Sequence, residues 1–233
     1  MRLLSWNIRD LLGDPLAVHK VVRSAAPDVV CFQEAPRRPG AAVRLALLGR
    51  GTGLRCVAGG RRSGGTALFV GPDVEVRWAA AFRLPTRGRF TRTRGASVAD
   101  LDVPGLGEVT VASVHLPLDA ASRLDHARRV ARVLAWRGGT AVVAGDLNEP
   151  AGAPAWTCWE TGPSASGPSD PWPEAGPTYP ASSPTVRIDA VLVTPGLRAL
   201  RVEPGPGEPA DVLRASDHLP VLAVLERETD REV

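Results

Sequence analysis

Several apolar segments of this chain end abruptly in an acid, an amide or a histidine. These segments, each with its terminal polar residues, are Arg2–Ile8 with Asn7, Asp28–Phe32 with Glu34, Glu108–His115 with His115, and Thr140–Ala144 with Asp146 and Asn148. Asp189 lies in another such segment, and Asp217 and His218 stand directly before the last one, Leu219–Leu225. Short apolar runs bounded by polar residues are typical of buried strands. Because α/β proteins place their chemistry at strand ends, we expect a polar site at one sheet edge.

Taken alone, the stretch "SDHLP" at residues 216–220 fits two interpretations equally well. One is a functional pair, since a histidine titrates near neutral pH and an adjacent carboxylate can orient it or bind a cation. The other is a polar turn that only leads into a strand. The rest of the chain has to decide between them.

Helical and strand-like segments alternate only in part. Apolar spacing predicts helices over Asp14–Ala26, Ala41–Leu48 and Asp119–Trp136, the first with Asp14 as N-cap and Pro15 at the first helical position. The middle of the chain contains strand-like runs alone, at Leu54–Ala58, Thr66–Val70, Val74–Phe82, Ala96–Val103 and Glu108–His115. Further strands are expected at Arg187–Val193 and Leu200–Glu203, and a long loop at Glu160–Pro184. This order favours two packed sheets flanked by helices over a single parallel, doubly wound sheet.

Length and composition indicate an ordinary globular protein. The chain has 233 residues, of which 44% are hydrophobic and 23% charged, and we expect one domain over residues 1–228 with a short polar tail at 229–233. No apolar run approaches the roughly 20 residues that span a bilayer. The first residues, "MRLLSWNIRD", do not resemble a signal peptide, and three widely spaced cysteines form no disulfide framework. These features predict a cytoplasmic protein, and we expect a monomer.

Positive charge is concentrated in one stretch. The net charge is only +3, but Arg83 to Arg94, "RLPTRGRFTRTR", contains five arginines and no acid. Such a stretch suits an anionic partner, either a nucleic acid or another phosphate ester. Compositional bias in a chain with 28 basic residues is the alternative explanation.

The sequence does not contain a complete P-loop or a serine-hydrolase motif. "GGRRSGGT" at residues 59–66 has nearly the spacing of a P-loop, but Gly65 stands where the lysine is needed and a strand follows in place of a helix. No G-x-S-x-G elbow is present for a serine hydrolase. His19 and His126 fall inside expected helices, where packing or surface roles are expected.

Six short stretches together resemble one family. They are "SWNIR", "CFQE", "SVHLPLD", "AGDLNEP", "RIDAVLV" and "SDHLPV", and they span Asn7 to His218. In this order they resemble the endonuclease/exonuclease/phosphatase superfamily, the DNase I-like metal-dependent phosphoesterases. The resemblance implies an α/β fold, a four-layer α/β sandwich of two packed, mostly antiparallel sheets flanked by helices.

The resemblance also implies a metal site. Glu34 resembles the principal divalent-metal ligand, Asn7 its neighbour, and Asp217 a carboxylate close to the metal. Mg²⁺ favours one or two carboxylates with several retained waters, so this set suits Mg²⁺ or Mn²⁺. Arg9 and Arg94 resemble residues that contact the substrate phosphate, the second on a loose alignment.

Catalytic roles are implied for five further residues. Asp146 and Asn148 resemble the pair that positions the attacking water and contacts the scissile phosphate. Asp189 resembles the carboxylate that orients the imidazole of His218, the proposed acid–base or phosphate-stabilising histidine. His115 resembles the second histidine of the DNase I-like branch. Hydrolysis of a phosphate ester needs an activated water and stabilisation of the developing charge, which such residues can supply.

Departures from the family pattern bear on the substrate. Ile8 and Arg9 after "WN", and His115 where repair nucleases have a tyrosine, argue against an abasic-site endonuclease. The glutamate that partners the second histidine in DNase I is absent, since Gly65 and Thr66 occupy that place. This absence argues against a strict DNase I mechanism. The arginine-rich stretch favours a phosphodiesterase that acts on nucleic acid. A phospholipid or inositol-phosphate phosphoesterase is the alternative, followed by a non-catalytic polyanion-binding module.

Overall fold

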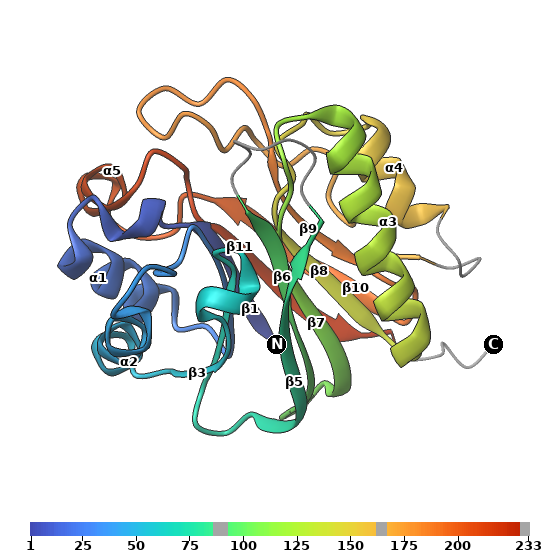
Figure 1. The fold of residues 1–233 in the computed structure, drawn as a ribbon, viewed down its shortest axis with the longest axis horizontal. Coiled ribbons are helices and arrows are strands. Elements are labelled where there is room, and N and C mark those ends of the chain that lie inside the picture. Colours follow the sequence, from blue (N-terminus) through green and yellow to red (C-terminus); the bar gives the residue numbers. More distant parts are fainter. Residues whose placement is uncertain (86–92, 162–166, 229–233) are drawn as a thin grey trace.

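Two stacked sheets form the centre of the computed structural model, which describes residues 1–85, 93–161 and 167–228 (Figure 1). Within these residues, sheet A comprises six strands in the order β10 (Leu197–Pro204), β11 (Val221–Arg227), β1 (Arg2–Asn7), β2 (Val29–Gln33), β4 (Ala67–Val70) and β3 (Arg55–Ala58). Sheet B comprises five in the order β5 (Glu75–Leu84), β6 (Arg94–Val103), β7 (Gly107–His115), β8 (Ala141–Asp146) and β9 (Asp189–Val193).

Helices cover the outer face of each sheet (Figure 1). Helices α1 (Pro15–Ala25), α2 (Ala41–Thr52) and α5 (Pro209–Ala215) lie over sheet A, and α3 (Ala120–Arg137) and α4 (Pro154–Glu160) over sheet B. Short 3₁₀ turns, Arg9–Leu11 and Gly60–Ser63, complete the described elements. The expected cap of α1 is present, because the Asp14 side chain accepts a hydrogen bond from the Leu16 amide and Pro15 is the first helical residue.

Three apolar cores separate these layers. Leu3 of β1 packs in the core between the sheets, whereas the next residue, Leu4, packs in the core between sheet A and its helices. A third core joins sheet B to α3 and α4 and contains Val130 and Trp159. Successive strand residues point to opposite faces, so a strand buried on both faces reads as a continuous apolar run. The predicted four-layer sandwich of mostly antiparallel sheets is confirmed.

Strand direction brings the polar strand ends together. β1 runs parallel to β2 and β7 runs parallel to β8, while the other pairs are antiparallel. Asn7 therefore lies opposite Gln33, and His115 lies opposite Asp146, at the ends of their strands. Because β9 is antiparallel to β8, its first residue, Asp189, is the register partner of Asp146.

A polar seam joins the two sheets beneath this edge. The Gln33 side-chain amide donates 3.4 Å hydrogen bonds to the hydroxyls of Ser5 in sheet A and Ser113 in sheet B. Ser113 in turn donates to the backbone oxygen of Phe32 at 3.1 Å. Thr66, just before β4, and Ser97 on β6 form a second link between hydroxyls 3.0 Å apart. These buried groups are hydrogen-bonded across the interface, which fixes one sheet relative to the other at this end.

The structure corrects several sequence-based boundaries. Two helices were not expected from the sequence. Helix α4 lies directly before the expected long loop, and α5 lies between β10 and β11. Each has seven residues, so packing of buried side chains such as Trp156, Trp159 and Val212 decides its formation more than propensity does. The helix expected at Ala41–Leu48 extends to Thr52, and the strand expected at Leu200–Glu203 begins at Leu197.

Parts of three predictions lie outside the described residues. They are the centre of the arginine-rich stretch (86–92), a piece of the long loop (162–166) and the polar tail (229–233). In the part of the chain that is described, no helix combines the length and the apolar character needed to cross a membrane.

Candidate active site

Asp146 is the centre of a buried hydrogen-bonded cluster at the shared edge of the sheets. Its Oδ2 atom accepts a hydrogen bond from the side-chain amide of Asn7 at 3.1 Å and lies 3.2 Å from Nε2 of His115. Its Oδ1 atom accepts a hydrogen bond from the backbone amide of Asn148 at 2.9 Å. Asn7 comes from sheet A and the other groups from sheet B, so this carboxylate connects the two halves of the site. The structure thus brings together four residues that the sequence singled out.

His218 approaches the same carboxylate from the segment that leads into β11. Its Nδ1 atom lies 3.0 Å from Asp189 Oδ2, and its Nε2 atom lies 3.9 Å from Asp146 Oδ2. The expected hydrogen bond between Asp189 and His218 is present. It fixes the ring so that Nε2 is directed toward the edge of the site where Asp146 lies.

The backbone of His218 is also held. Its carbonyl oxygen accepts a hydrogen bond from the Trp6 indole at 2.9 Å, and its amide donates to the Ser216 hydroxyl at 3.2 Å. Ser216 donates in turn to the backbone oxygen of Asn7 at 2.6 Å. The aromatic ring of Tyr179 packs against the imidazole, with ring centroids 4.7 Å apart. The polar turn before β11 is therefore tied to β1 and to the loop before β9.

Asn148 follows β8 on a loop that is itself clamped. Its side-chain amide donates to the backbone oxygen of Leu116 at 2.8 Å, and its φ of 52° lies in the left-handed region that few non-glycine residues adopt. The next residue, Glu149, forms a buried ion pair with Arg123 of α3 at 2.7 Å. Glu149 also accepts a hydrogen bond from the first turn of α4 at Ala155. These contacts hold a strained residue at the edge of the site.

Three predicted residues lie at a more open rim. Glu34 follows β2 with a φ of 48° and is half-buried. Arg9 and Asp217 form an ion pair at 3.8 Å, and their side chains are 54% and 43% exposed. Arg94 begins β6 and is buried, with Leu84 as its register partner. The roles of these residues in metal and phosphate binding stay predictions.

The charges in the buried cluster shift the pKa values of its members. Burial, followed by the negative charge of Asp189, raises the pKa of Asp146 to about 7. Burial alone would lower the pKa of His218, but the hydrogen bond and charge of Asp189, with the charges of Asp146 and Asp217, outweigh it and raise that pKa to about 9. At neutral pH the His218 imidazole is therefore positively charged, which makes Nε2 a donor.

Three buried residues at this edge could hold a metal ion. Ligand atoms of Asp146, Asp189 and His218 lie within 4.8 Å of one another, and Asp189 Oδ1 is buried with no hydrogen-bond partner among the described residues. The carboxylates of Glu34 and Asp217 lie at the rim. Oxygen-rich donor sets suit Mg²⁺ and Mn²⁺.

The expected metal ligands and this buried trio are not the same residues. Asn7, expected beside the metal, uses its side-chain oxygen to accept from the Arg9 amide at 3.1 Å and its nitrogen to bind Asp146. Its amide therefore orients Asp146 in this structure.

Sequence reasoning missed four contacts of the site: Tyr179 against His218, the Arg123–Glu149 pair, the Ser216 link to β1, and Thr178, whose hydroxyl accepts from the Asp189 amide at 3.2 Å. Two of them stood next to residues that were singled out, since Glu149 belongs to "AGDLNEP" and Ser216 to "SDHLPV". Tyr179 and Thr178 lie in the expected loop, where spacing gives no signal of tertiary contact.

Proteins of known structure share this fold over almost the whole chain. An endonuclease/exonuclease/phosphatase protein of Bacteroides vulgatus is 22% identical with a TM-score of 0.80, covering 97% of this chain and 98% of its own. A mannosyl-6-phosphatase of Bacteroides thetaiotaomicron VPI-5482 is 18% identical, with a TM-score of 0.77 and coverage of 97% and 99%. A humanized D. rerio TDP2 carrying 14 mutations is 16% identical, with a TM-score of 0.73 and coverage of 97% and 98%. At these identities the likeness shows the fold alone.

Comparison by sequence identifies the family. No curated protein sequence matches the chain. The model of the Endonuclease/Exonuclease/phosphatase family matches residues 4–218, which include the site residues from Asn7 to His218, whereas β11 lies wholly beyond the match. This chain therefore belongs to the endonuclease/exonuclease/phosphatase family, whose members are divalent-metal-dependent phosphoesterases.

Proposed function

We propose that the chain hydrolyses phosphodiester bonds in nucleic acid with the help of Mg²⁺ or Mn²⁺. The observation that carries this proposal is the buried chain of contacts from Asp189 through His218 to Asp146. It directs a positively charged imidazole and a carboxylate toward the same edge, where a phosphate ester would meet both. A binding module without catalysis would not need these groups to be fixed so closely.

Glu34 and Asp217 are the proposed ligands of the metal, at the open rim beside the buried cluster. A bound Mg²⁺ or Mn²⁺ supplies a Lewis acid that offsets negative charge on the phosphate. Arg9, which forms an ion pair with Asp217, is proposed to contact a phosphate oxygen from the same side. The exposure of this pair leaves room for a substrate to enter.

His218 is proposed to stabilise the phosphate as charge develops. Its raised pKa keeps the imidazole protonated at neutral pH, so that Nε2 donates a hydrogen bond to a phosphate oxygen. Asp189 holds the other nitrogen and keeps the ring in this orientation. Tyr179 limits rotation of the ring from its face.

Asp146 is proposed to receive the proton of the attacking water, and Asn148 to orient that water. A pKa of about 7 suits a group that accepts a proton near neutral pH. Asn7 and His115 fix the carboxylate from two sides.

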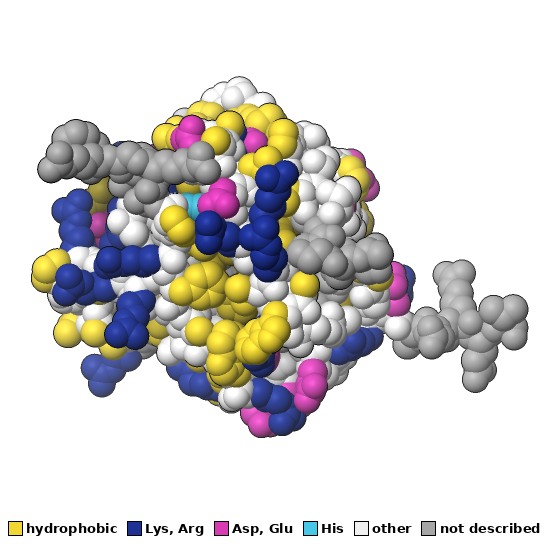
Figure 2. Space-filling model, turned by 45° about the vertical axis from the view of Figure 1, so that its right-hand side comes forward, with side chains coloured by type: hydrophobic (Ala, Val, Ile, Leu, Met, Phe, Trp, Pro, Cys, Tyr) yellow, Lys and Arg dark blue, Asp and Glu magenta, His cyan; other side chains and the backbone are white. Residues whose placement is uncertain are grey.

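Nucleic acid is the proposed substrate because the chain carries an arginine-rich stretch and further exposed arginines. Arg38, Arg61, Arg62 and Arg83 are exposed in the described residues, and the arginine-rich stretch continues into residues 86–92. Figure 2 shows lysine and arginine side chains gathered over one face of the molecule, with few acidic side chains among them. Such a face attracts polyanions and makes binding dependent on salt.

A phosphorylated polyol, such as an inositol phosphate, or a phospholipid is the second candidate substrate. The similarity of this fold to that of a mannosyl-6-phosphatase supports it. The free state of Cys31, Cys56 and Cys158 supports a reducing compartment, and we propose the cytoplasm.

A panel of substrates tests these proposals. Purified protein would be incubated with Mg²⁺ or Mn²⁺ and plasmid DNA, single-stranded RNA, sphingomyelin or inositol phosphates, each with an EDTA control. Cleavage of DNA or RNA that stops in EDTA is the expected result. Turnover of inositol phosphates or sphingomyelin alone would replace the nucleic-acid proposal, and full activity in EDTA would contradict the metal mechanism.

A further inference from the structure

Helix α3 carries five arginines that differ in their partners: Arg123, Arg128, Arg129, Arg132 and Arg137. Three of them form ion pairs: Arg123 with Glu149, Arg129 with Asp125, and Arg137 with Asp100. Arg128 and Arg132 have no carboxylate partner in the ranges 1–85, 93–161 and 167–228. The two arginines without such a partner are one turn apart on the same face of the helix.

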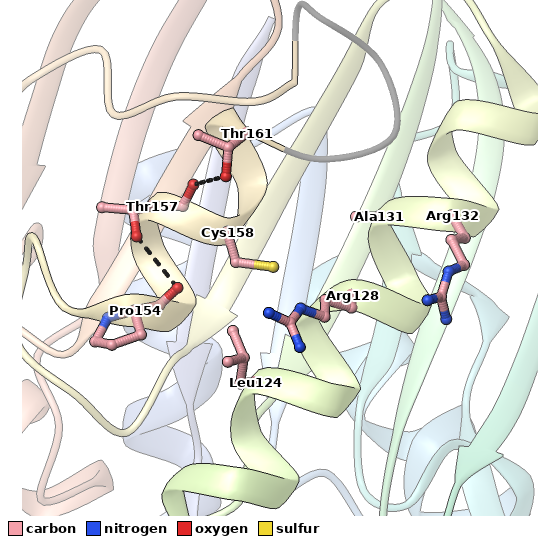
Figure 3. A pocket seen from close by; sticks show the side chains of 8 residues that line it. All are labelled: Leu124, Arg128, Ala131, Arg132, Pro154, Thr157, Cys158 and Thr161. Atoms are coloured by element: carbon pink, nitrogen blue, oxygen red, sulfur yellow. Dashed lines mark hydrogen bonds between the residues drawn. The ribbon is translucent and has the colours of Figure 1, made fainter.

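Both of these arginines line a single cavity of about 520 Å³ between α3 and α4 (Figure 3). The residues that line it are Leu124, Arg128, Ala131 and Arg132 from α3, and Pro154, Thr157, Cys158 and Thr161 on or beside α4. No carboxylate is among them. The volume lies within the range of sites that bind small organic molecules, roughly 300–1,000 Å³.

The buried thiol on the facing helix does not neutralise this charge. Figure 3 shows the guanidinium of Arg128 directed toward Cys158, with Arg132 farther along α3. Burial raises the pKa of the Cys158 thiol, while Arg128 and Arg132 act in the opposite direction. The thiol is therefore neutral at pH 7 and contributes no negative charge to the cavity. Like charges at this helical spacing destabilise the helix slightly, so a bound anion would be favourable there.

We propose that this cavity is a second binding site, separate from the active site, for a small organic phosphate. Arg128 and Arg132 would bind the phosphate oxygens, since guanidinium groups form paired, charge-assisted hydrogen bonds with phosphate. The apolar wall of Leu124, Ala131 and Pro154 would contact the organic part of the ligand. None of the lining residues belongs to the cluster around Asp146.

The test measures binding in metal-free protein, so that it does not depend on catalysis. All measurements use the Cys56→Ser variant, because Cys56 is exposed and would also react with the alkylating reagent. Cys31 is wholly buried and is left in place. The probe is phenylphosphonate, whose carbon–phosphorus bond the proposed activity does not cleave. We expect phenylphosphonate to slow the alkylation of Cys158 by iodoacetamide in a saturable manner, with mass spectrometry as the readout. Isothermal titration calorimetry gives the affinity independently if the thiol reacts too slowly.

A matched arginine on the same helix provides the control. Arg128→Gln with Arg132→Gln should weaken phenylphosphonate binding by about ten- to a hundredfold, the loss of charge-assisted hydrogen bonds. Arg129→Gln, which removes an arginine paired with Asp125, should change it less than about twofold. All three side chains are exposed, so the variants should fold, as checked by circular dichroism.

Four results would overturn the proposal. The first is that phenylphosphonate neither protects Cys158 saturably nor binds in calorimetry. The second is an equal loss of affinity in the Arg129→Gln control, and the third is equal protection of Cys158 by sodium chloride at the same ionic strength. The fourth is that inorganic phosphate binds as tightly as phenylphosphonate, which would remove the role of the apolar wall. Within the first of these results, protection by a short oligonucleotide but not by phenylphosphonate would replace the proposal by a nucleic-acid contact.

Discussion

The two sheets contribute unlike halves to the candidate active site. From sheet B come His115, Asp146 and Asp189, all at most 2% exposed and bound to one another or to neighbours by short contacts. From sheet A and its loops come Glu34 and the Arg9–Asp217 pair, which lie at the open rim. Two residues of sheet A belong to the closed half: Asn7 at the end of β1 bonds to Asp146, and His218 before β11 bonds to Asp189.

This difference separates two tasks that a hydrolase has to perform. Groups that orient a reacting atom have to be fixed before the substrate arrives, which burial and hydrogen bonding achieve. Groups that bind an ion or a charged substrate have to stay accessible. The closed half should therefore govern kcat, and the open half should govern metal affinity and KM.

Removing the residue that bridges the halves should have the largest effect. His218→Ala deletes the donor directed at the substrate phosphate, and we expect kcat to fall by on the order of 10³ with a small change in KM. His126→Gln is the control, because His126 is a buried histidine that bonds to the Pro85 carbonyl outside the site and should leave kcat within a few-fold. Near-normal turnover of His218→Ala would show that the bridge is only structural.

Glu34→Gln tests the open half. Loss of one carboxylate charge should weaken Mg²⁺ binding by about a hundredfold and abolish most turnover at a fixed metal concentration, while the thermal unfolding midpoint of the metal-free protein stays unchanged. Glu203→Gln, a change of the same chemistry on β10, should alter neither quantity. Calorimetric titration with Mg²⁺ measures the affinity. Unchanged affinity in Glu34→Gln would move the metal toward the buried trio of Asp146, Asp189 and His218.

The pH dependence of stability sharpens the description of the closed half. Because the folded-state pKa of His218 is raised to about 9, above its ordinary value, the imidazolium stabilises the metal-free fold fully below pH 6.5, and this contribution is lost as the pH rises toward 9. The contribution is at most about 3 kcal/mol. Urea unfolding of wild type and His218→Gln in EDTA at pH 6 and pH 9.5 should therefore show a larger difference at pH 6. A difference that is constant with pH would contradict the raised pKa.

Asp189→Asn should have a smaller effect than His218→Ala. An asparagine of the same size still contacts Nδ1 but removes the charge, and we expect kcat to fall by on the order of ten- to a hundredfold. Since Asp189 acts through His218, the double variant should be little worse than His218→Ala alone. Additive losses in the double variant would mean that Asp189 has a separate role, for example as a metal ligand.

Neutralising the arginine-rich stretch should have the smallest effect. Replacing Arg87, Arg89 and Arg92 together by glutamine should raise KM for nucleic acid a few-fold, reduce its dependence on salt and leave kcat unchanged. The control is the same replacement of Arg23, Arg50 and Arg198, which are exposed and outside the site. If both triple variants behave alike, the stretch reflects composition and the nucleic-acid proposal loses its main support.

The fold was predictable because most of its strands can be identified from the local sequence alone. Strands buried on both faces, such as β2 and β8, read as continuous apolar runs, and polar residues mark where they end. Which strand ends meet is not a local property, and family resemblance supplied it. The register that places Asp189 opposite Asp146 depends on the antiparallel direction of β9, which no spacing along the chain reveals.

The supporting contacts of the site were less predictable than its polar residues. Tyr179 packs against His218 from a loop, and Glu149 pairs with Arg123 and accepts a hydrogen bond from the first turn of α4. Each contact therefore depends on elements that are separate in the chain. Short helices such as α4 and α5 depend in the same way on the surface against which they pack. Pro154 and Pro209, each in the first turn, were the one local signal that a helix begins there.

The place of β1 in sheet A has a consequence for when activity can arise during synthesis. β1 lies between β11 and β2, and the Trp6 indole binds the carbonyl of His218 across 212 residues of sequence. A ribosome-bound chain that lacks β11 therefore carries Asn7 and Asp146 without the histidine or the strand that seals them. The proposed hydrolytic centre would therefore be complete only after His218 and β11 have been synthesised and have packed against β1.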